Sequence, residues 1–336
     1  MPNHPKKIRT TVLPTLATIV AMAIATTALL HSTVASAAPP AWPVKPITII
    51  VPFPAGGGTD VVMRAIQPQL SKALGQPVVI DNRSGAGGTV GSALVARAQP
   101  DGYTAGIVTT STHAVSPSVY KSLPYDPVTD FSYVGFIGTS PYVLVTNVDL
   151  HATDVKSLLA ILKTGKTNNF ASVGVGTVSH LMGAKFQQLT DSALIHVPYR
   201  GAAPAYTDLI GGQVQMMFDN PIALSAYVSA KKLSAIATTA ATPLLPDVPT
   251  FAQQGIEGFT QELWYGIALP KNTPPEIVAR FNDVLNGVLT DPAVVADLTS
   301  KGVTPKPATP QALQDAVAHD VPFWRDIAQS VGANIE

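Results

Sequence analysis

The chain has 336 residues, in which 21 lysines and arginines balance 21 aspartates and glutamates, and it contains no cysteine. A protein that binds a phosphate backbone needs a basic surface, so this charge argues against nucleic-acid binding. The lack of cysteine excludes disulfides, thiolate metal sites and a cysteine nucleophile. Only 12% of the residues are charged, whereas glycine (25) and proline (30) are plentiful, which indicates a compact fold with many tight turns rather than a disordered chain.

The N-terminal segment has the three parts of a secretory signal peptide. Three basic residues precede an uncharged apolar stretch over 11–30, and Ala35-Ser36-Ala37 offers small residues at positions −3 and −1 of a cleavage site. A transmembrane anchor is the alternative, but the stretch contains Pro14 and is barely long enough to span a membrane. Cleavage after Ala37 removes those three basic residues and leaves 299 residues with 18 basic and 21 acidic side chains, a formal charge of −3. We therefore expect a periplasmic protein of about two domains.

Short apolar strands, glycine-rich loops and helices alternate in the first part of the chain. The pattern predicts strands at 47–51, 78–80 and 103–109, a helix over about 61–70 and a second helix that ends near 98. Alternation of this kind predicts a parallel sheet covered by helices.

The same alternation returns after Tyr142. Further strands are predicted at 142–145, 170–173, 193–197, 215–219, 233–238 and 263–269, with helices at 154–163, up to about 189, from near 204, at 277–289 and from 309–310. The last predicted strand ends at 269 and mainly helices follow, so these helices are expected to pack on the first domain. The chain would then cross between two α/β domains near 140–146 and again near 260–268, with domain 1 at 43–142 and 264–336 and domain 2 at 143–263. Two crossings predict a hinge and a cleft.

The loop at 52–60, Pro-Phe-Pro-Ala-Gly-Gly-Gly-Thr-Asp, carries the strongest local signal. Three glycines let the backbone approach a ligand closely, and the helix that follows offers free N–H groups to an anion. The loop matches neither the phosphate-binding nor the dinucleotide-binding glycine pattern, because no Gly-Lys-Ser/Thr follows and Val61 stands where the third glycine would belong. Ligand contact and a tight turn capped by Thr59 or Asp60 stay equally open. For the glycine-rich segment at 84–91 a structural role is favoured.

Polar residues also follow several other predicted strands. The segments Thr109–His113 and Gly176–His180 offer small hydroxyls that could cap helices or donate to a carboxylate, while a structural role is favoured for each histidine. Tyr199, Arg200 and Asp219 stand at strand ends, where open α/β sheets place ligands. Arg200 is favoured as a solvated loop residue, and Asp219 as a ligand contact.

Catalytic signatures are missing from the sequence. It has no Gly-x-Ser-x-Gly elbow, no Ser-x-x-Lys, no His-Glu-x-x-His and no histidine pair at metal spacing. We predict a binding protein without a metal or cofactor, and a periplasmic hydrolase is the rival interpretation.

A series of ordered motifs resembles the Bug-type solute receptors of tripartite tricarboxylate transporters. The motifs lie at 42–47, 52–60, 81–88, 100–104, 123–127, 179–181, 196–201, 209–214, 218–220 and 245–250. The resemblance covers essentially all of 42–336.

The resemblance implies a type II periplasmic-binding-protein fold, with two interdomain crossovers and a central cleft that closes on a small carboxylate. It implies these ligand-binding residues: Phe53, Ala55, Gly56, Gly57, Asp60, Thr110, Ser111, His113, Thr177, Ser179, His180, Tyr199 and Asp219. The expected ligand is a dicarboxylate or an aromatic carboxylate, and the expected partner of this monomeric receptor is a tripartite membrane transporter. A membrane sensor is the alternative partner.

The chain departs from the family pattern in three places. These are Val115-Ser116-Pro117, Val178 and the loop Tyr199-Arg200-Gly201. All three lie around the end of the cleft that is expected to select the ligand, so the identity of the organic acid stays open.

Overall fold

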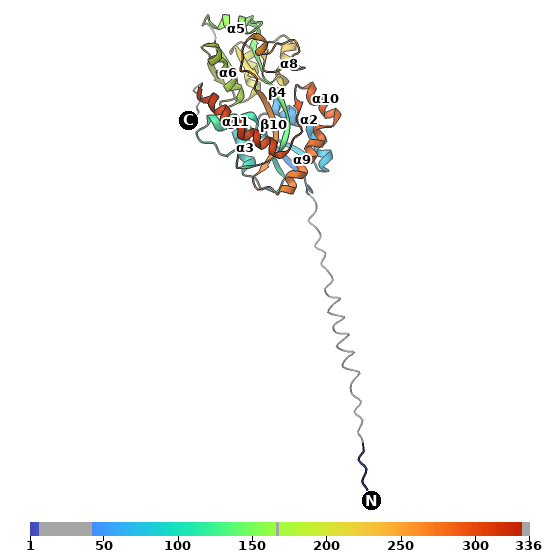
Figure 1. Cartoon of the computed structure of the whole chain (residues 1–336). Helices are drawn as coiled ribbons and strands as arrows, with labels where there is room; N and C mark the ends of the chain where they lie inside the picture. The colour runs from blue at the N-terminus through green and yellow to red at the C-terminus, as the bar shows by residue number, and fades with distance from the viewer. Residues whose placement is uncertain (7–41, 166–167, 331–336) are drawn as a thin grey trace. The chain divides into compact units, whose positions relative to one another are not determined.

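The computed structural model describes residues 1–6, 42–165 and 168–330 (Figure 1), and a compact unit begins at Trp42. All but the first six residues of the predicted signal peptide lie outside the described residues, so the signal peptide stays a prediction. Within the described part of the chain, no helix is both long and apolar enough to cross a membrane.

The first of two sheets has six strands in the order β11-β4-β10-β3-β1-β2. The strands are β1 (Ile47–Val51), β2 (Val78–Asn82), β3 (Thr104–Thr109), β4 (Phe131–Pro141), β10 (Glu262–Pro270) and β11 (Thr304–Pro305). β1 pairs in parallel with β2 and β3, whereas β10 pairs antiparallel with both β3 and β4. The expectation of a wholly parallel sheet is therefore wrong, because a strand from late in the chain enters the sheet between β3 and β4.

The second sheet has five strands in the order β7-β6-β8-β5-β9. They are β5 (Val143–Asn147), β6 (Asn169–Ser172), β7 (Ile195–Pro198), β8 (Met216–Asp219) and β9 (Leu233–Thr238). β6 pairs in parallel with β7 and β8, while β5 pairs antiparallel with β8 and β9. This sheet is also mixed rather than parallel.

Helices cover both sheets. They are α2 (Gly58–Leu74), α3 (Thr89–Ala96), α4 (Ser116–Val119), α5 (Val155–Leu162), α6 (Val178–Thr190), α7 (Ala202–Ile210), α8 (Pro221–Ser229), α9 (Pro275–Leu289), α10 (Pro292–Ser300) and α11 (Pro310–Ser330). α9 packs on β4 and α2, and α11 packs on β4 and α4. The expected return of the C-terminal helices to the first sheet is thus confirmed (Figure 1).

The chain passes between the two sheets twice. It leaves the first sheet at the end of β4 and enters β5 after Tyr142, then returns between β9 and β10. The domain boundaries given above stay predictions, and the distribution of strands between the sheets is compatible with them.

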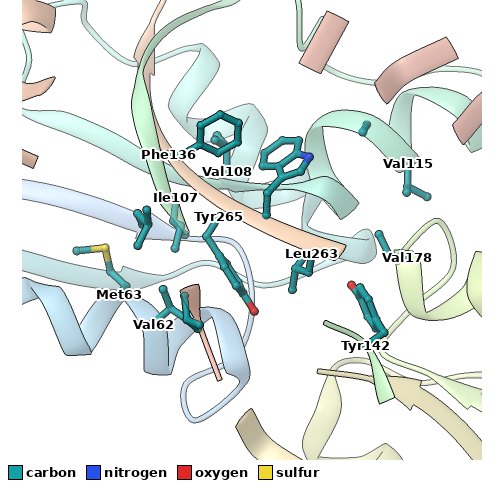
Figure 2. Packing of buried hydrophobic residues seen from close by; sticks show 14 of the residues in the cluster. Val62, Met63, Ile107, Val108, Val115, Phe136, Tyr142, Val178, Leu263 and Tyr265 are labelled. Atoms are coloured by element: carbon teal, nitrogen blue, oxygen red, sulfur yellow. The ribbon is translucent and has the colours of Figure 1, made fainter. Parts of the chain in front are cut away.

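β10 lies at the centre of the first core. Its Tyr265 is fully buried and points toward Val62 on α2 (Figure 2). Tyr142, at the crossing to the second sheet, is 3% exposed. Apolar packing therefore extends from the first sheet to the point where the chain crosses, and it fixes the loops that surround the cleft.

Candidate functional site

Two neighbouring cavities lie where loops from both sheets meet. The first cavity, of about 440 Å³, is lined by the loop after β1, by Thr109 and Ser111 after β3, by Tyr142 and by the first turns of α7 and α8. The second cavity, of about 620 Å³, is lined by the segment 84–88, by Tyr120 and by the loops after β6 and β7. The two cavities share Phe53, Pro54 and Val173.

Three helices begin at the first cavity without a side-chain cap. Their N-cap residues are Gly57 for α2, Gly201 for α7 and Asn220 for α8. Among the helices that begin elsewhere, α5, α6 and α10 are capped by Asp154, Thr177 and Asp291, whereas α3, α4 and α9 also lack a side-chain cap. Residues of the three first turns line the cavity: Gly58, Thr59, Ala202, Ala203, Ile222 and Ala223. Free N–H groups and the positive ends of three helix dipoles therefore converge on one space, which suits an anion.

Asp60 holds the glycine loop in shape. Its Oδ2 accepts hydrogen bonds from the Gly56 amide (2.9 Å) and Arg64 Nε (2.8 Å), and its Oδ1 accepts one from Asn82 Nδ2 (3.0 Å). Burial raises the pKa of Asp60, but these hydrogen bonds outweigh burial and hold its pKa below the ordinary value. Both oxygens of the Asp60 carboxylate accept hydrogen bonds from neighbouring residues of the protein, and Asp60 lines neither cavity.

Asp219 lies on the wall of the first cavity at the end of β8. Its Oδ2 accepts a hydrogen bond from the Tyr206 hydroxyl (2.7 Å) and its Oδ1 accepts one from the Asn220 amide (2.8 Å). Burial raises the pKa of Asp219 to about 6, and the two hydrogen bonds offset only part of this effect. No ion pair of Asp219 is present among residues 42–165 and 168–330.

The two histidines of the predicted site lie away from both cavities. His113 is fully buried in contact with the rings of Tyr125, Phe131 and Tyr133, and burial lowers its pKa to about 3. His180 stacks on His196 with 4.0 Å between ring centroids, and burial lowers its pKa to about 4. Neither side chain lines a cavity, and burial favours the neutral form of both rings.

The predicted hydroxyl groups mostly bind backbone. Ser111 lines the first cavity, and its Oγ accepts a hydrogen bond from the Val178 amide (3.2 Å). Thr110 Oγ1 accepts one from the Trp264 amide, Thr177 caps α6, and Ser179 Oγ donates to the Phe218 carbonyl. Of these four hydroxyl residues, Ser111 alone lines one of the two cavities.

Tyr199 and Arg200 lie at the second cavity. The Tyr199 hydroxyl donates a hydrogen bond to Asp208 Oδ2 (2.7 Å), and burial is the first of the causes that raise the pKa of Tyr199 to about 12. Arg200 is exposed. These two residues therefore face a different space from Asp219.

Comparison with known proteins identifies the family. Residues 62–333 match the family model described as "Tripartite tricarboxylate transporter family receptor". This chain belongs to the tripartite tricarboxylate transporter receptor family. Members of this family are solute-binding receptors and not enzymes.

Relatives of this receptor agree in sequence and in fold. Protein BugT of Bordetella pertussis is 36% identical over 299 residues, which cover 88% of this chain and 92% of that protein. The periplasmic binding protein BugD is 34% identical with a TM-score of 0.83, covering 88% of this chain and all of that structure. The receptor therefore has the α/β periplasmic-binding-protein fold of type II, with two crossovers and a central cleft.

Two solved relatives hold organic acids. An R. palustris protein with adipate is 33% identical with a TM-score of 0.83, covering 87% of this chain and 98% of that structure. MatC from Rhodopseudomonas palustris, with bound malate, is 32% identical with a TM-score of 0.80, covering 85% of this chain and 99% of that structure.

The predicted residues of this receptor fall into three groups. Those that line the first cavity are Phe53, Ala55, Gly56, Gly57, Ser111 and Asp219. Phe53 and Tyr199 line the second cavity. Those that line neither are Asp60, Thr110, His113, Thr177, Ser179 and His180, and each of them supports a neighbouring loop or helix start.

The structure adds the polar cavity residues Tyr142, Tyr206 and Asn220, which the sequence reasoning missed, and Thr109, which it named only as part of the segment Thr109–His113. A signal was present for Asn220, because Asn-Pro directly after a buried strand is typical of a helix start at a sheet edge. Tyr206 gave no such signal, since its role depends on the position of α7 beside β8.

Proposed function

We propose that this protein is a periplasmic receptor that captures a small organic acid, a dicarboxylate or an aromatic carboxylate, and delivers it to a tripartite membrane transporter. The supporting observation is the convergence of three uncapped helix N-termini on the first cavity. The adipate and malate held by two relatives support the same ligand class.

In this proposal a ligand carboxylate lies against the loop at 53–57 and the start of α2. Backbone N–H groups replace the water around the carboxylate. A charge-assisted hydrogen bond contributes roughly 1.5–3 kcal/mol net, so a few such bonds suit micromolar binding, at about −8 kcal/mol. Ser111 and Asp219 contact the ligand from other walls of the same cavity, and Tyr199 contacts the part that reaches the second cavity.

Ligand capture favours the closed form of the receptor. The first cavity is built from loops of both sheets, so a ligand that fills it binds the closed form more tightly than the open one. The membrane partner then recognises the closed form.

A thermal-shift screen of the chain from residue 38 tests the ligand class. The panel contains di- and tricarboxylates, aromatic carboxylates, amino acids and nicotinate, after unfolding and refolding to remove bound ligand. An acid at 100 times its Kd adds about 2.7 kcal/mol of stability, which raises Tm by a few degrees. A panel without any stabilising acid overturns the proposal.

Gly57→Asp tests the placement of the carboxylate. Gly57 has extended backbone angles (φ −74°, ψ 164°), and an added Cβ meets the Pro54 carbonyl oxygen at 3.4 Å, an ordinary contact. The new carboxylate would cap α2 from the position proposed for the ligand, so we expect a folded protein with at least tenfold weaker binding. Gly57→Ala adds a Cβ without charge and is expected to bind better than Gly57→Asp. Equal binding by the two variants contradicts the placement.

Delivery to a transporter is tested by capture of membrane partners with and without the acid. We expect transporter subunits to be retained by the liganded receptor, whereas recovery of a sensor protein would overturn the proposed partner. Native mass measurement checks the expected monomer.

A further inference from the structure

The first cavity contains acceptors as well as donors. The side chains of Asp219 and Asn220 are 6% and 5% exposed, and both residues line the cavity. Asn220 Oδ1 is buried without a hydrogen-bond partner among the described residues. A buried acceptor that is left unpaired costs free energy, so this atom requires a donor that the protein does not supply.

The acceptors lie beside the proposed carboxylate position. The Asn220 side-chain amide packs against Gly58 so closely that a Cβ added there would overlap it. Asp219 Oδ1 accepts hydrogen bonds from the Asn220 backbone and, at 3.4 Å, from Asn220 Nδ2. Donors at the start of α2 and acceptors at the end of β8 are therefore separated by a single amide group.

Within the described part of the chain, no lysine, arginine or histidine forms an ion pair with Asp219. The titratable groups that face it are the hydroxyls of Tyr206 on α7, Tyr142 at the crossing and Tyr265 on β10. Tyr206 donates to Asp219, whereas Tyr265 has no hydrogen-bond partner among the described residues. The carboxylate of a ligand placed here would be repelled by Asp219, while a donor would be attracted.

We propose that the acid recognised by this receptor carries a hydroxyl or ammonium group close to its carboxylate, and that Asp219 and Asn220 accept hydrogen bonds from that group. This inference rests on the proposed carboxylate site and adds the substituent that the ligand requires. A site built to pair with a donor discriminates strongly against the analogue without one, because its own acceptors are then left unpaired.

Succinate, malate and aspartate form a matched series that tests the substituent. These acids share a four-carbon dicarboxylate skeleton and carry hydrogen, hydroxyl and ammonium, respectively, at one carbon. Benzoate, 2-hydroxybenzoate and 2-aminobenzoate form the aromatic series, in which the donor stands beside the carboxylate and a neutral amine replaces the ammonium. Titration calorimetry at pH 8 is expected to show that a donor-bearing member binds at least tenfold more tightly than the parent acid of its series. If the ammonium compound binds most tightly, charge neutralisation dominates, and if the hydroxyl compound does, hydrogen bonding alone suffices.

Asp219→Asn tests the acceptor directly. The variant keeps the shape of the side chain but removes its charge, so binding of the donor-bearing acid is expected to fall about tenfold or more, while binding of succinate or benzoate is unchanged or improves. Asp320→Asn is the matched control, because Asp320 also accepts a hydrogen bond from an aromatic side chain, Trp264 Nε1 at 2.8 Å, and lines neither cavity. Thermal unfolding confirms that both variants are folded.

The outcomes separate this inference from the proposed function. If succinate or benzoate binds as well as its substituted analogues, the requirement for a donor is wrong and the carboxylate receptor stands. If no acid of either series and none of the wider panel binds, the proposed function fails. If Asp320→Asn alters the preference as Asp219→Asn does, the effect does not arise at Asp219 and the inference is overturned.

Discussion

Gly58 is the residue at which the start of α2 touches the end of β8. Its Cα packs against the Asn220 side chain, and a methyl group at this position would displace that amide. The close approach joins an element of the first sheet to an element of the second.

Gly58→Ala is expected to weaken binding of the cognate acid about tenfold, because the displaced Asn220 widens the first cavity. Tm should change little, since alanine is favourable in the first turn of a helix. Gly287→Ala is the control, because Gly287 lies within α9 with no atom within 4 Å of an added Cβ. It should raise stability by about 0.5–1 kcal/mol and leave binding unchanged. Parent-like binding by Gly58→Ala would show that the contact does not shape the cavity.

Asp219 makes the stability of the ligand-free protein depend on pH. Its pKa is raised from 3.8 to about 6 in the folded state, mainly by burial, so the folded protein binds more protons than the unfolded chain between these pH values. The contribution of Asp219 to the free energy of unfolding is therefore zero below pH 4 and becomes unfavourable as the pH rises to 6 and above. A pKa shift of about two units lowers the free energy of unfolding by about 3 kcal/mol at most.

Asp219→Asn should consequently unfold at a higher temperature than the parent at pH 8 and at a similar temperature at pH 4. Thermal unfolding of both proteins across this range provides the measurement. A Tm difference that is constant with pH would show that the carboxyl group titrates normally.

At the level of elements, α2, α7 and α8 share an uncapped N-terminus that lies beside the first cavity. α5, α6 and α10 are each capped by an aspartate or a threonine, and α9, which also lacks a side-chain cap, begins away from the cavity. The N–H groups that a cap would satisfy are left available in the cleft.

Ala203→Glu should weaken binding of an organic acid at least tenfold, because it places a carboxylate in the first turn of α7 on the cavity wall. Ala293→Glu is a close control, since Ala293 is exposed at the corresponding position of α10, away from both cavities. Calorimetry is expected to show at least a tenfold loss for Ala203→Glu and parent-like binding for Ala293→Glu. Tm should be unchanged or slightly raised in both, so a binding loss in Ala293→Glu would indicate an unspecific effect of charge.

Local patterns predicted the elements whose hydrophobic residues are adjacent in sequence. β1 and β9 lie at the predicted residues, and α9 begins at Pro275 as the prolines indicate. β4 was missed, because an 11-residue strand that contains Gly135 and Gly138 is stabilised by pairing with β10 from late in the chain. Pairing over such a distance leaves no periodic signal in the local sequence.

The site was predicted best where the backbone supplies the chemistry. The glycine loop at 52–60 was found from its composition, and it does line the first cavity. The position of His113 could not be found in this way, because its burial depends on Phe131 and Tyr133, which reach it only when β4 joins the sheet. Which other predicted residues contact the ligand stays a prediction.

Across the whole molecule, hydrogen bonds join segments that follow β3 to segments that follow β6. The Tyr120 hydroxyl donates to the Val175 carbonyl (3.2 Å), and Ser116 Oγ donates to the Gly176 carbonyl (3.3 Å). Both bonds span the two sheets, so in the closure proposed above they would favour the form in which the sheets approach each other.

Tyr120→Phe should lower affinity for the organic acid by about 2- to 10-fold, the value of one hydrogen bond, because closure becomes less favourable. Tyr133→Phe is the control, since its hydroxyl donates to the Pro127 carbonyl beside the same sheet. That variant should lose stability and keep its affinity. A parent-like Kd for Tyr120→Phe would show that this bond does not contribute to closure.

The position of β10 also determines when the protein can fold. β10 separates β3 from β4 in the first sheet, yet it is made long after both of them. A chain that emerges N-terminus first therefore cannot complete its larger sheet until residues 262–270 are present. Until then, β3 and β4 each have an edge that lacks the partner strand β10. The larger sheet therefore reaches its final form only after most of the chain has been made, so the native fold of this part is completed late in synthesis.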